Sequence, residues 1–443
     1  MNKLNSYKNS IIMKSKKIAL IILLSTLFVG CSQNKIVELP LTIHNGYGPF
    51  IAGFGGLSTI SEDENNPWES TYPKILNFPK GLTDMKFGFI ETNHYQSAYQ
   101  NYLLGNITKD MYEGLFKSNR APDTLNLSKT PIKTKIAFVY GKDLEGVLKM
   151  VVDVNNNLDL SDDKLFTPLE LDWNNADLLA QQYAFDVSFE TFVHNKIISV
   201  SAPLYIVYYS QGEMFACNFS QHVITQYKGT QIAISSGGFT NLSYDYINLA
   251  FINDLKKGDK VVKYDDIYSK NEYIEIEGEI LKILGVNTNK NCLVLEKIDL
   301  PKSQLYAAQK GYKPYPFQGE EFTTKTEISL DSFRGKYVLL DFWAEWCAPC
   351  LQEIPNLKEL YAKTDRTKFE IIGIVGKSSP NGLEKLIDKY EITWSQILSD
   401  DIIETYKING YPTTLLIDTE GFIIAKDLFG KELEETVLNL FKE

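Results

Sequence analysis

Short apolar runs that end in turn residues fill the chain between residue 32 and about residue 300. Runs of this kind, rich in β-branched and aromatic residues, are typical of β-strands. The expected strands are Ile136–Tyr140, Val147–Val154, Ile197–Tyr209, His222–Ile234 and Tyr273–Val286. The segment Val286–Asn291 interrupts two such runs and predicts a hairpin loop. Apolar residues at three-to-four spacing predict helices at Thr108–Ser118 and Asp172–Gln182. We therefore expect a β-rich α+β N-terminal domain over residues 31–305, of unknown role and with room for two subdomains.

Beyond about residue 310 the pattern changes to strands that alternate with helices. The expected strands are Lys336–Trp343, Phe369–Val375, Thr413–Asp418 and Phe422–Lys426. The expected helices are Cys347–Ala362, Gly382–Lys389, Asp401–Tyr406 and an amphipathic one at Asp427–Phe441. This alternation predicts an α/β domain over residues 311–443, in which helices cover a central sheet. The polar segment Leu300–Lys313, which contains Pro301 and Gly311, is the expected linker.

The composition is that of an ordinary soluble globular protein. Of 443 residues, 44% are hydrophobic and 23% are charged, which excludes disordered, collagen-like and disulfide-framework chains. The net charge is −11, and the first thirty residues contain five lysines and no acid, so the rest of the chain is more acidic still. An acidic surface repels phosphate backbones. We therefore expect no nucleic-acid partner.

The first thirty residues have the organisation of an export signal. A basic stretch through residue 17 precedes an apolar run, Ile18–Val29, in which only Ser25 and Thr26 are polar. Spanning a bilayer takes about 20 apolar residues, so this run is too short for a membrane helix and fits a secretory signal. A cleaved signal peptide over residues 1–30 is the prediction.

The end of that segment, Leu27–Cys31, resembles the bacterial lipobox, after which the cysteine is lipidated and becomes the first mature residue. The usual leucine stands one position early, and Phe28 occupies its place. The resemblance implies a lipid anchor on Cys31, and several acyl chains give stable membrane attachment. We expect an exported protein that is anchored to a bacterial membrane and faces the periplasm. The alternative is a plain signal peptide followed by an incidental cysteine.

The stretch Trp343–Cys350 reads W-A-E-W-C-A-P-C and stands where the expected buried strand Val338–Asp341 passes into a helix. The first turn of a helix has N–H groups without partners and a positive dipole end. A thiolate at Cys347 is stabilised there, which lowers the pKa of the thiol and makes it nucleophilic. Cys350 lies one turn deeper on the same face, where it can attack a mixed disulfide at Cys347. Pro349 fits the first turn because its missing N–H would have no partner there. The sequence thus predicts a thiol–disulfide exchange site.

This motif, W-x-x-W-C-x-P-C, resembles that of the thioredoxin superfamily, and the similarity covers residues 311–443. A second element, Ile408–Thr414, is similar to the family's cis-proline loop, with Pro412 as the proline. Phe333–Lys336 and a long insert around Trp394 resemble the extracytoplasmic TlpA-like reductases. The resemblance implies a thioredoxin-like fold and no cofactor beyond a redox-active disulfide. It also implies periplasmic protein disulfides as clients and an electron donor in the membrane.

The resemblance further implies roles for individual residues. Cys347 is the attacking thiol and Cys350 the resolving thiol of the redox-active disulfide. Asp341 matches the buried acid of thioredoxin, a proton acceptor for Cys350, at a position where TlpA-like relatives often have Asn. Glu353 is a second candidate base, with a solvated helix carboxylate as the alternative. The residues expected to line a substrate groove are Trp346, Tyr411 and Pro412.

Other uses of the cysteine pair fit the sequence less well. Half of a zinc site needs a second Cys or His pair, which residues 311–443 lack. If the pair formed a fixed structural disulfide, the tryptophan before it, the proline within it and the Pro412 loop would have no evident role. A peroxiredoxin needs P-x-x-x-[ST]-x-x-C, and Leu340 and Ala344 occupy the first two of those positions. Active exchange is the prediction, with reduction favoured by the resemblance.

Oxygen-bearing side chains at alternate positions resemble the start of a calcium loop. The candidate ligands are Asp153, Asn155, Asn157 and Asp159. Leu158 stands where such a loop needs Gly, and Lys164 stands where a closing Glu is required. The alternative is an Asn/Asp-rich turn after a strand.

Two questions stay open at the level of the sequence. Cys217 and Cys292 either pair across the β-rich region or lie apart as buried apolar thiols. For the whole protein, the alternative to a lipid-anchored oxidoreductase is a ligand-binding surface lipoprotein. In that case residues 31–305 would be the working part and the redox domain an accessory.

Overall fold

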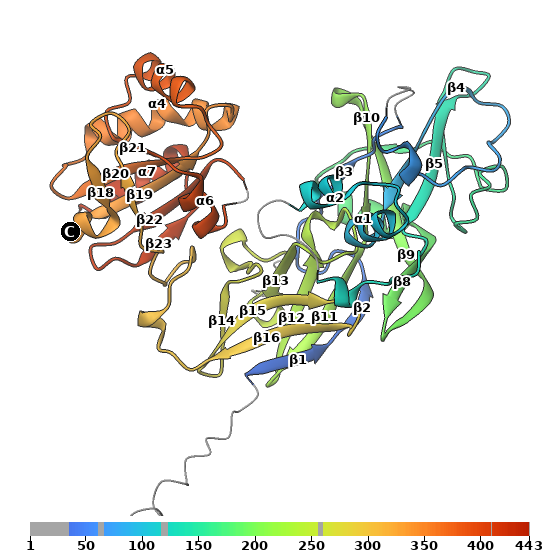
Figure 1. Ribbon diagram of the computed structural model, residues 1–443, viewed down its shortest axis with the longest axis horizontal. Coiled ribbons are helices and arrows are strands. Elements are labelled where there is room, and N and C mark those ends of the chain that lie inside the picture. Colours follow the sequence, from blue (N-terminus) through green and yellow to red (C-terminus); the bar gives the residue numbers. More distant parts are fainter. Residues whose placement is uncertain (1–34, 61–65, 117–122, 256–259, 409, 443) are drawn as a thin grey trace, which may run out of the picture.

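The computed structural model of the protein describes residues 35–60, 66–116, 123–255, 260–408 and 410–442. It has a β-rich part, from Ile36 to Ile298, made of two stacks of sheets. A smaller part, from Gln318 to Asn439, has helices around one sheet (Figure 1). The predicted signal segment 1–30 and Cys31 lie outside the described residues. No helix among the described residues has the length and apolar character needed to cross a membrane.

Two antiparallel four-stranded sheets pack face to face in the half of the β-rich part that adjoins the smaller part. The first sheet has the order β1 (Ile36–Pro40), β16 (Cys292–Ile298), β15 (Glu279–Asn287) and β14 (Tyr273–Ile276). The second has the order β13 (Ile247–Phe251), β12 (Thr230–Ser236), β11 (Gln221–Tyr227) and β2 (Thr42–Asn45). Because side chains alternate along a strand, one face of each sheet supplies the buried core between them. That core includes Leu39, Ile232, Leu249, Leu281 and Leu295.

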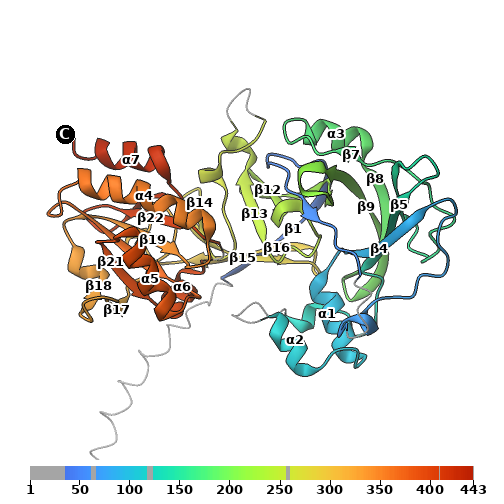
Figure 2. The same cartoon turned by 90° about the horizontal axis from the view of Figure 1, so that it is seen from above.

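A second stack lies further from the smaller part (Figure 2). Its first sheet has the order β3 (Gly55–Gly56), β10 (Met214–Phe219), β9 (Lys196–Tyr209) and β7 (Leu169–Glu170), with β8 (Phe185–Val193) also paired to β9. Its second sheet contains β4 (Thr83–Glu91), β5 (Lys135–Lys142) and β6 (Leu148–Val152). The core between them includes Ile136, Phe138, Val187, Leu204 and Phe219. The helices of this part are α1 (His94–Leu103), α2 (Lys109–Leu115) and α3 (Ala176–Tyr183).

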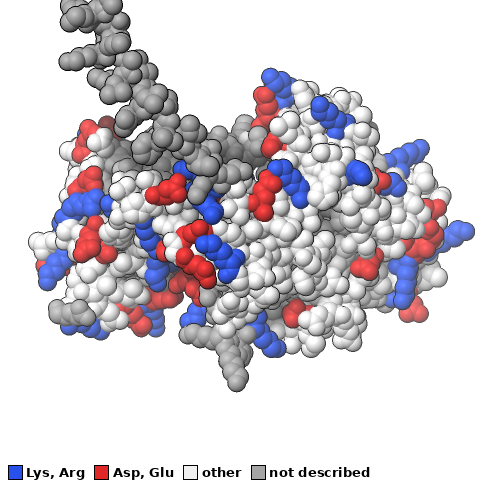
Figure 3. All heavy atoms as spheres, turned by 90° about the horizontal axis from the view of Figure 1, so that it is seen from below, with Lys and Arg blue, Asp and Glu red and all other residues white. Residues whose placement is uncertain are grey.

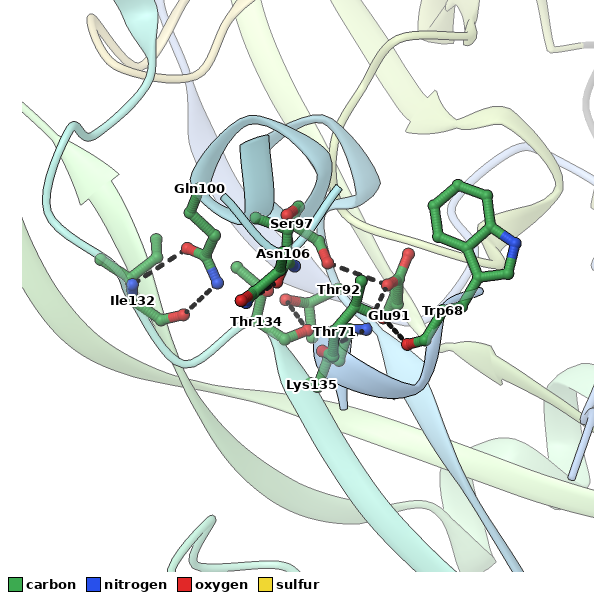
Figure 4. A network of polar contacts seen from close by, with 11 residues as sticks. Trp68, Thr71, Glu91, Thr92, Ser97, Gln100, Asn106, Ile132, Thr134 and Lys135 are labelled. Carbon is green, nitrogen blue, oxygen red and sulfur yellow. Dashed lines mark hydrogen bonds and ion pairs between the residues drawn. The ribbon is translucent and has the colours of Figure 1, made fainter. Parts of the chain in front are cut away.

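Polar contacts fasten α1 to the segment beside it (Figure 4). The Gln100 amide donates to the carbonyl of Ile132 at 3.1 Å and accepts from the Ile132 N–H at 3.0 Å. One turn earlier, the Gln96 amide makes the same pair of bonds with the backbone of Ser128, at 3.0 and 2.8 Å. The two glutamines thus satisfy backbone groups that have no strand partner, as buried backbone requires.

The smaller part is a five-stranded sheet with helices on both faces. The strand order is β21 (Ser395–Leu398), β20 (Phe369–Val375), β19 (Tyr337–Trp343), β22 (Thr413–Ile417) and β23 (Ile423–Lys426). β19, β20 and β21 are parallel, and β22 runs antiparallel to β19. One face packs on α4 (Ala348–Lys363), α5 (Pro380–Tyr390) and α7 (Gly430–Asn439), and the other packs on α6 (Asp400–Tyr406). A small hairpin, β17 (Gln318–Glu320) and β18 (Glu327–Ser329), lies beside β21. The sheet flanked by helices agrees with the sequence prediction.

The predicted linker, Leu300–Lys313, packs against both parts. Tyr312 stacks on Tyr273 of β14, with the ring centroids 5.1 Å apart. The Tyr312 carbonyl accepts from the N–H of Ile423 in β23 at 3.0 Å, and the Ile423 carbonyl accepts from the N–H of Gly311 at 2.7 Å. Strand-like pairing on one side and an aromatic stack on the other therefore join the two parts.

Two predicted strands are hairpins instead. The run His222–Ile234 spans β11 and β12, and the run Tyr273–Val286 spans β14 and β15. Left-handed residues reverse the chain at 228–229, with φ of 46° and 85°, and at 277–278, with φ of 48° and 78°. Such two-residue turns connect hairpin strands. The prediction was wrong because apolar residues continue on both sides of each short turn.

The strands and helices predicted for the smaller part agree closely with the structure. β20 has the predicted bounds, and α4 begins one residue later than predicted. In the β-rich part both predicted helices are present but start later than predicted. α2 begins at Lys109, with Thr108 as its N-cap, and α3 begins at Ala176. α1, whose buried side is largely polar, was not predicted from the sequence.

We expect Gln96→Ala to lower the free energy of unfolding by about 1–3 kcal/mol, because the N–H and the carbonyl of Ser128 both lose their partner while buried. Urea unfolding of the mature chain measures the change. Gln181→Ala in α3 is the matched control, since its amide donates to the exposed Asp177 carboxylate, and it should stay within about 0.5 kcal/mol of the parent. Equal effects of the two variants would contradict a structural role for the Gln96 amide.

Candidate active site

Cys347 lies at the junction between β19 and α4, where it caps the helix. Its Sγ accepts a hydrogen bond from the backbone N–H of Cys350 at 3.2 Å. The two cysteines form a disulfide with an S–S distance of 2.02 Å. N–H groups of the first helical turn have no partner within the helix, and they favour negative charge on an atom placed before them. The structure thus puts the Cys347 sulfur where a thiolate is stabilised.

The disulfide lies just below the surface of the smaller part. Cys347 and Cys350 are each 4% exposed. The residues around them are exposed, namely Ala348, Pro349 and above all Trp346, at 61%. A partner that reaches the Cys347 sulfur must therefore contact this rim.

The predicted cis-proline loop stands beside the disulfide-bearing junction. The Tyr411–Pro412 peptide bond is cis, and Thr413, the next residue, is the register partner of Phe342 in β19. The rings of Tyr411 and Trp346 meet edge to face, with centroids 5.7 Å apart. The three residues predicted to line a groove are thus brought together at one end of β19.

Asp341 lies in β19 among buried residues and is itself 6% exposed. Its register partners are Thr414 of β22 and Gly373 of β20, so it sits in the middle of the sheet. Burial, with a smaller effect of the nearby Glu353 charge, raises the pKa of Asp341 to about 7. A carboxyl with this pKa can accept and release a proton near neutral pH.

Glu353 connects α4 to the start of α7. One carboxylate oxygen accepts from the backbone N–H of Gly430, the first residue of α7, at 2.6 Å. The other accepts from the Asn356 amide at 2.8 Å. A carboxylate at a helix N-terminus stabilises that helix, so this side chain is neither fully solvated nor free of protein partners.

Gln396 of β21 holds the indole behind the disulfide. The Trp343 Nε1 donates to the Gln396 side-chain oxygen at 2.9 Å, and both residues are buried. A Cβ on Gly373 of β20 would overlap the Gln396 amide. Three adjacent strands therefore fix this contact, which the sequence analysis did not predict.

The loop between β20 and α5 fixes the residues before Cys347. The Glu345 carboxylate accepts from the N–H of Ser379, the N-cap of α5, at 2.9 Å. The Trp346 Nε1 donates to the carbonyl of Lys377 at 3.0 Å. These partners were not predicted from the sequence, although Ser379 followed by Pro380 is a typical helix start.

The candidate calcium ligands lie in a turn after β6. Asp153 accepts from the N–H groups of Asn157 and Leu158 at 2.9 and 2.8 Å. Asn155 accepts from the same Asn157 N–H at 3.0 Å, and Asp159 accepts from the Ser161 N–H at 3.0 Å. Among the described residues, no group of three or more His, Cys, Asp or Glu side chains is arranged to hold a metal ion. The structure thus brings the four candidate ligands together in one turn, and calcium binding there stays a prediction.

Cys217 in β10 and Cys292 in β16 are both buried free thiols. Burial raises the pKa of Cys217 to about 12, and it also raises the pKa of Cys292. Of the two alternatives, the structure has separate buried thiols, and a thiol held protonated in this way is a poor nucleophile.

Comparisons with known proteins match the smaller part. A model of the AhpC/TSA family matches residues 315–426. Thiol-disulfide oxidoreductase ResA of Bacillus thuringiensis subsp. konkukian is 31% identical over 119 residues, which are 26% of this chain and 68% of the relative. ResA of Geobacillus thermodenitrificans is 36% identical over 98 residues, 21% of this chain and 56% of the relative.

Among solved structures, the thioredoxin domain of a thiol-disulfide oxidoreductase from Bacteroides vulgatus is 33% identical. The similarity covers 30% of this chain and 96% of that domain, with a TM-score of 0.28. The sequence match to the Bacillus relative extends over two thirds of its length, which identifies the family. The chain therefore belongs to the thioredoxin superfamily and, within it, to the TlpA/ResA-like thiol–disulfide oxidoreductases.

Proposed function

We propose that this chain is an exported, lipid-anchored oxidoreductase that reduces disulfides of periplasmic proteins through Cys347 and Cys350. The observation that carries the proposal is the Cys347 sulfur at the N-cap of α4, bonded to the Cys350 N–H at 3.2 Å. The cis-proline loop beside it and the buried Asp341 of the preceding strand β19 support the same activity.

The exchange begins when the Cys347 thiolate attacks one sulfur of a client disulfide. A bond forms between Cys347 and that sulfur, and the other client sulfur leaves as a thiolate and takes up a proton. Cys350 then attacks Cys347, which releases the second client thiol and leaves the Cys347–Cys350 disulfide. Two electrons have passed to the client, so a dithiol donor, which we place at the membrane, must reduce the pair again.

Asp341 takes the proton of Cys350 in the second step. The Cys350 thiol must lose its proton before it attacks, since the thiolate is the nucleophile. Burial gives Asp341 a pKa of about 7, which suits a proton acceptor at neutral pH. Glu353, with both oxygens engaged by Gly430 and Asn356, acts as a positioning residue that keeps negative charge near Asp341.

The rest of the chain would hold the redox domain at the membrane surface. In this proposal residues 1–30 are the signal peptide, and Cys31 carries the lipid that holds the protein on a membrane facing the periplasm. Residues 31–305 form the β-rich domain and residues 311–443 the redox domain. The rim of Trp346, Tyr411 and Pro412 receives the client.

We expect Cys350→Ser in the otherwise unchanged chain to accumulate client proteins bound to Cys347 by a disulfide. Without the resolving thiol, the mixed disulfide has no fast route to release. Non-reducing electrophoresis of cell extracts, followed by identification of the captured proteins, measures this outcome.

Two variants serve as controls for trapping. Cys347→Ser combined with Cys350→Ser should trap nothing, because the attacking sulfur is absent. Cys217→Ser combined with Cys292→Ser should leave exchange unchanged, because both thiols are buried and free in the structure. Failure of Cys350→Ser to capture any protein would contradict exchange at this site.

We expect Asp341→Asn to stabilise the protein at alkaline pH while slowing client release. The folded chain holds a proton on Asp341 up to a pKa of about 7, against an ordinary value of 3.8. The unfolded chain loses that proton at lower pH, so stability falls as the pH rises between these values. Relative to the parent, the free energy of unfolding of the variant should therefore rise by about 2–4 kcal/mol as the pH is raised from 4 to 8, as measured by urea unfolding.

The same variant should resolve a preformed mixed disulfide about 100-fold more slowly at pH 7, as followed by the release of a labelled peptide. Asp388→Asn on the exposed side of α5 should change neither stability nor release. A pH profile of stability that Asp341→Asn leaves unaltered would show that this carboxyl is not the titrating group.

A further inference from the structure

Asp341 shares a row with Gly373 and Gln396 across three neighbouring strands. Asp341 of β19 is the register partner of Gly373 of β20, which in turn is the register partner of Gln396 of β21. These strands lie side by side in the sheet of the smaller part (Figure 1). Neighbouring strands are about 4.8 Å apart, so Gly373 occupies the place between the acid and the glutamine.

Asp341 and Gly373 point to the face of the sheet that α4 covers. Side chains alternate along a strand, and Leu339 and Trp343, two residues before and after Asp341, belong to the buried core that also contains both cysteines. The residues two positions to either side of Gly373 belong to the same core. The row therefore runs beneath the helix that carries the cysteine pair.

The Gln396 amide fills the space that Gly373 leaves free. A Cβ placed on Gly373 would overlap this amide, with the Nε2 atom 2.7 Å away. The amide Oε1 accepts from the Trp343 Nε1 at 2.9 Å, and the Nε2 donates to the Trp394 carbonyl at 3.2 Å. The amide and the indole together therefore cover the position next to Asp341 in the row.

The main chain of Gln396 is fixed by the loop of the β17–β18 hairpin. Its N–H donates to the Glu321 carboxylate at 3.3 Å, and its carbonyl accepts from the Phe322 N–H at 2.7 Å. Gln396 is 1% exposed and Trp343 is 2% exposed. The backbone and the amide of Gln396 are thus both held, and so is the indole that donates to the amide.

Asp341 is shielded from water, unlike the charged side chains seen in Figure 3, where acidic and basic groups lie close together at the surface. Burial, followed by the charge of Glu353, raises the pKa of Asp341. A carboxyl that burial keeps neutral ionises more easily once water reaches it. The side chains that exclude water from Asp341 therefore determine the pH at which it takes a proton.

The other elements packed against Asp341 carry a few titratable groups. Glu353 of α4 acts on its charge, and the cysteine pair lies in the core on the same side of the sheet. On the β22 side, the register partner of Asp341 is the uncharged Thr414, whose carbonyl accepts from the Asp427 N–H at 2.9 Å. The charged side chains in the first turn of α7 are exposed, namely Lys431 and Glu432. On the β20 side, the row places an uncharged amide.

We propose that Gln396 is a positioning residue for the resolving step: it holds the Trp343 indole in place, and the amide and the indole keep water away from Asp341. This inference rests on the proposed function, in which Asp341 takes the proton of Cys350. The Cys350 sulfur then bonds to Cys347, and the client sulfur leaves as a thiolate. Gln396 exchanges no proton itself, and it acts on the pH at which the Asp341 carboxylate is available.

The test replaces Gln396 by Leu in the full mature chain. Leucine has a similar volume but offers no acceptor, so the buried indole N–H loses its partner and the cover over Asp341 loosens. NMR of the oxidised protein labelled with ¹³C-aspartate follows the Asp341 carboxyl carbon, which is assigned by comparison with Asp341→Asn. The titration midpoint should lie at about pH 7 in the parent and about one pH unit lower in Gln396→Leu.

Three further variants separate positioning from damage to the core. Gly373→Ala puts a Cβ where the amide lies, so it should lower the midpoint as Gln396→Leu does, although Gln396 itself is unchanged. Gln396→Glu keeps an oxygen that accepts from the Trp343 Nε1, so its midpoint should not fall below that of the parent. Gln226→Leu, at an exposed position of β11, is the matched control and should leave the midpoint unchanged.

The resolving step gives the second measurement. Release of a labelled peptide from a preformed mixed disulfide, followed between about pH 5 and pH 9, should show the same lowered midpoint in Gln396→Leu and Gly373→Ala. Titration of Asp341 at the parent's pH in both variants would overturn the inference. If the Asp341 midpoint falls but release does not follow it, or if the parent reduces no disulfide, the proton role of Asp341 in the proposed function fails. The NMR titration then still decides whether Gln396 shields this carboxyl.

Discussion

The redox part depends on a single interaction, the placement of the Cys347 sulfur at the N-terminus of α4. A sulfur in this position accepts the Cys350 N–H and lies before the positive end of the helix. The strand that precedes it, β19, runs through the middle of the sheet between β20 and β22. Because the sheet fixes β19 on both sides, the helix start and the sulfur are held in place by a strand in which six of seven residues are buried.

The same strand carries a second constraint, the carboxyl group of Asp341. Burying a carboxyl among apolar neighbours favours its neutral form, and the pKa of about 7 reflects this. A residue chosen only for stability at this position would be apolar or amide-bearing. The cost of keeping an acid there is understandable if the acid handles a proton during exchange, and Glu353 on the neighbouring helix makes that acid harder still to ionise.

The sequence was most informative where a feature is local. The C-x-x-C pair, the helix start and the cis-proline loop are each contained within a few residues, and β20 could be bounded to the residue. Contacts between distant segments could not be predicted in this way. Gln396 and Trp343 are 53 positions apart, and nothing in either neighbourhood indicates that they meet. α1 was missed for a different reason, since its buried side is largely polar and includes Gln96, which binds the backbone of Ser128.

The pairing of β1 with β16 has a mechanical consequence. Ile36 is opposite Glu296, and Lys35 forms an ion pair with Asp299 at 3.1 Å, so the first described residues adjoin the segment that leads into the linker. A pull on the amino end would pass directly into β16 and on to the redox part, bypassing the second stack of sheets. Because the strands are antiparallel, that load would act at one end of the pair, and its hydrogen bonds would break one after another rather than together.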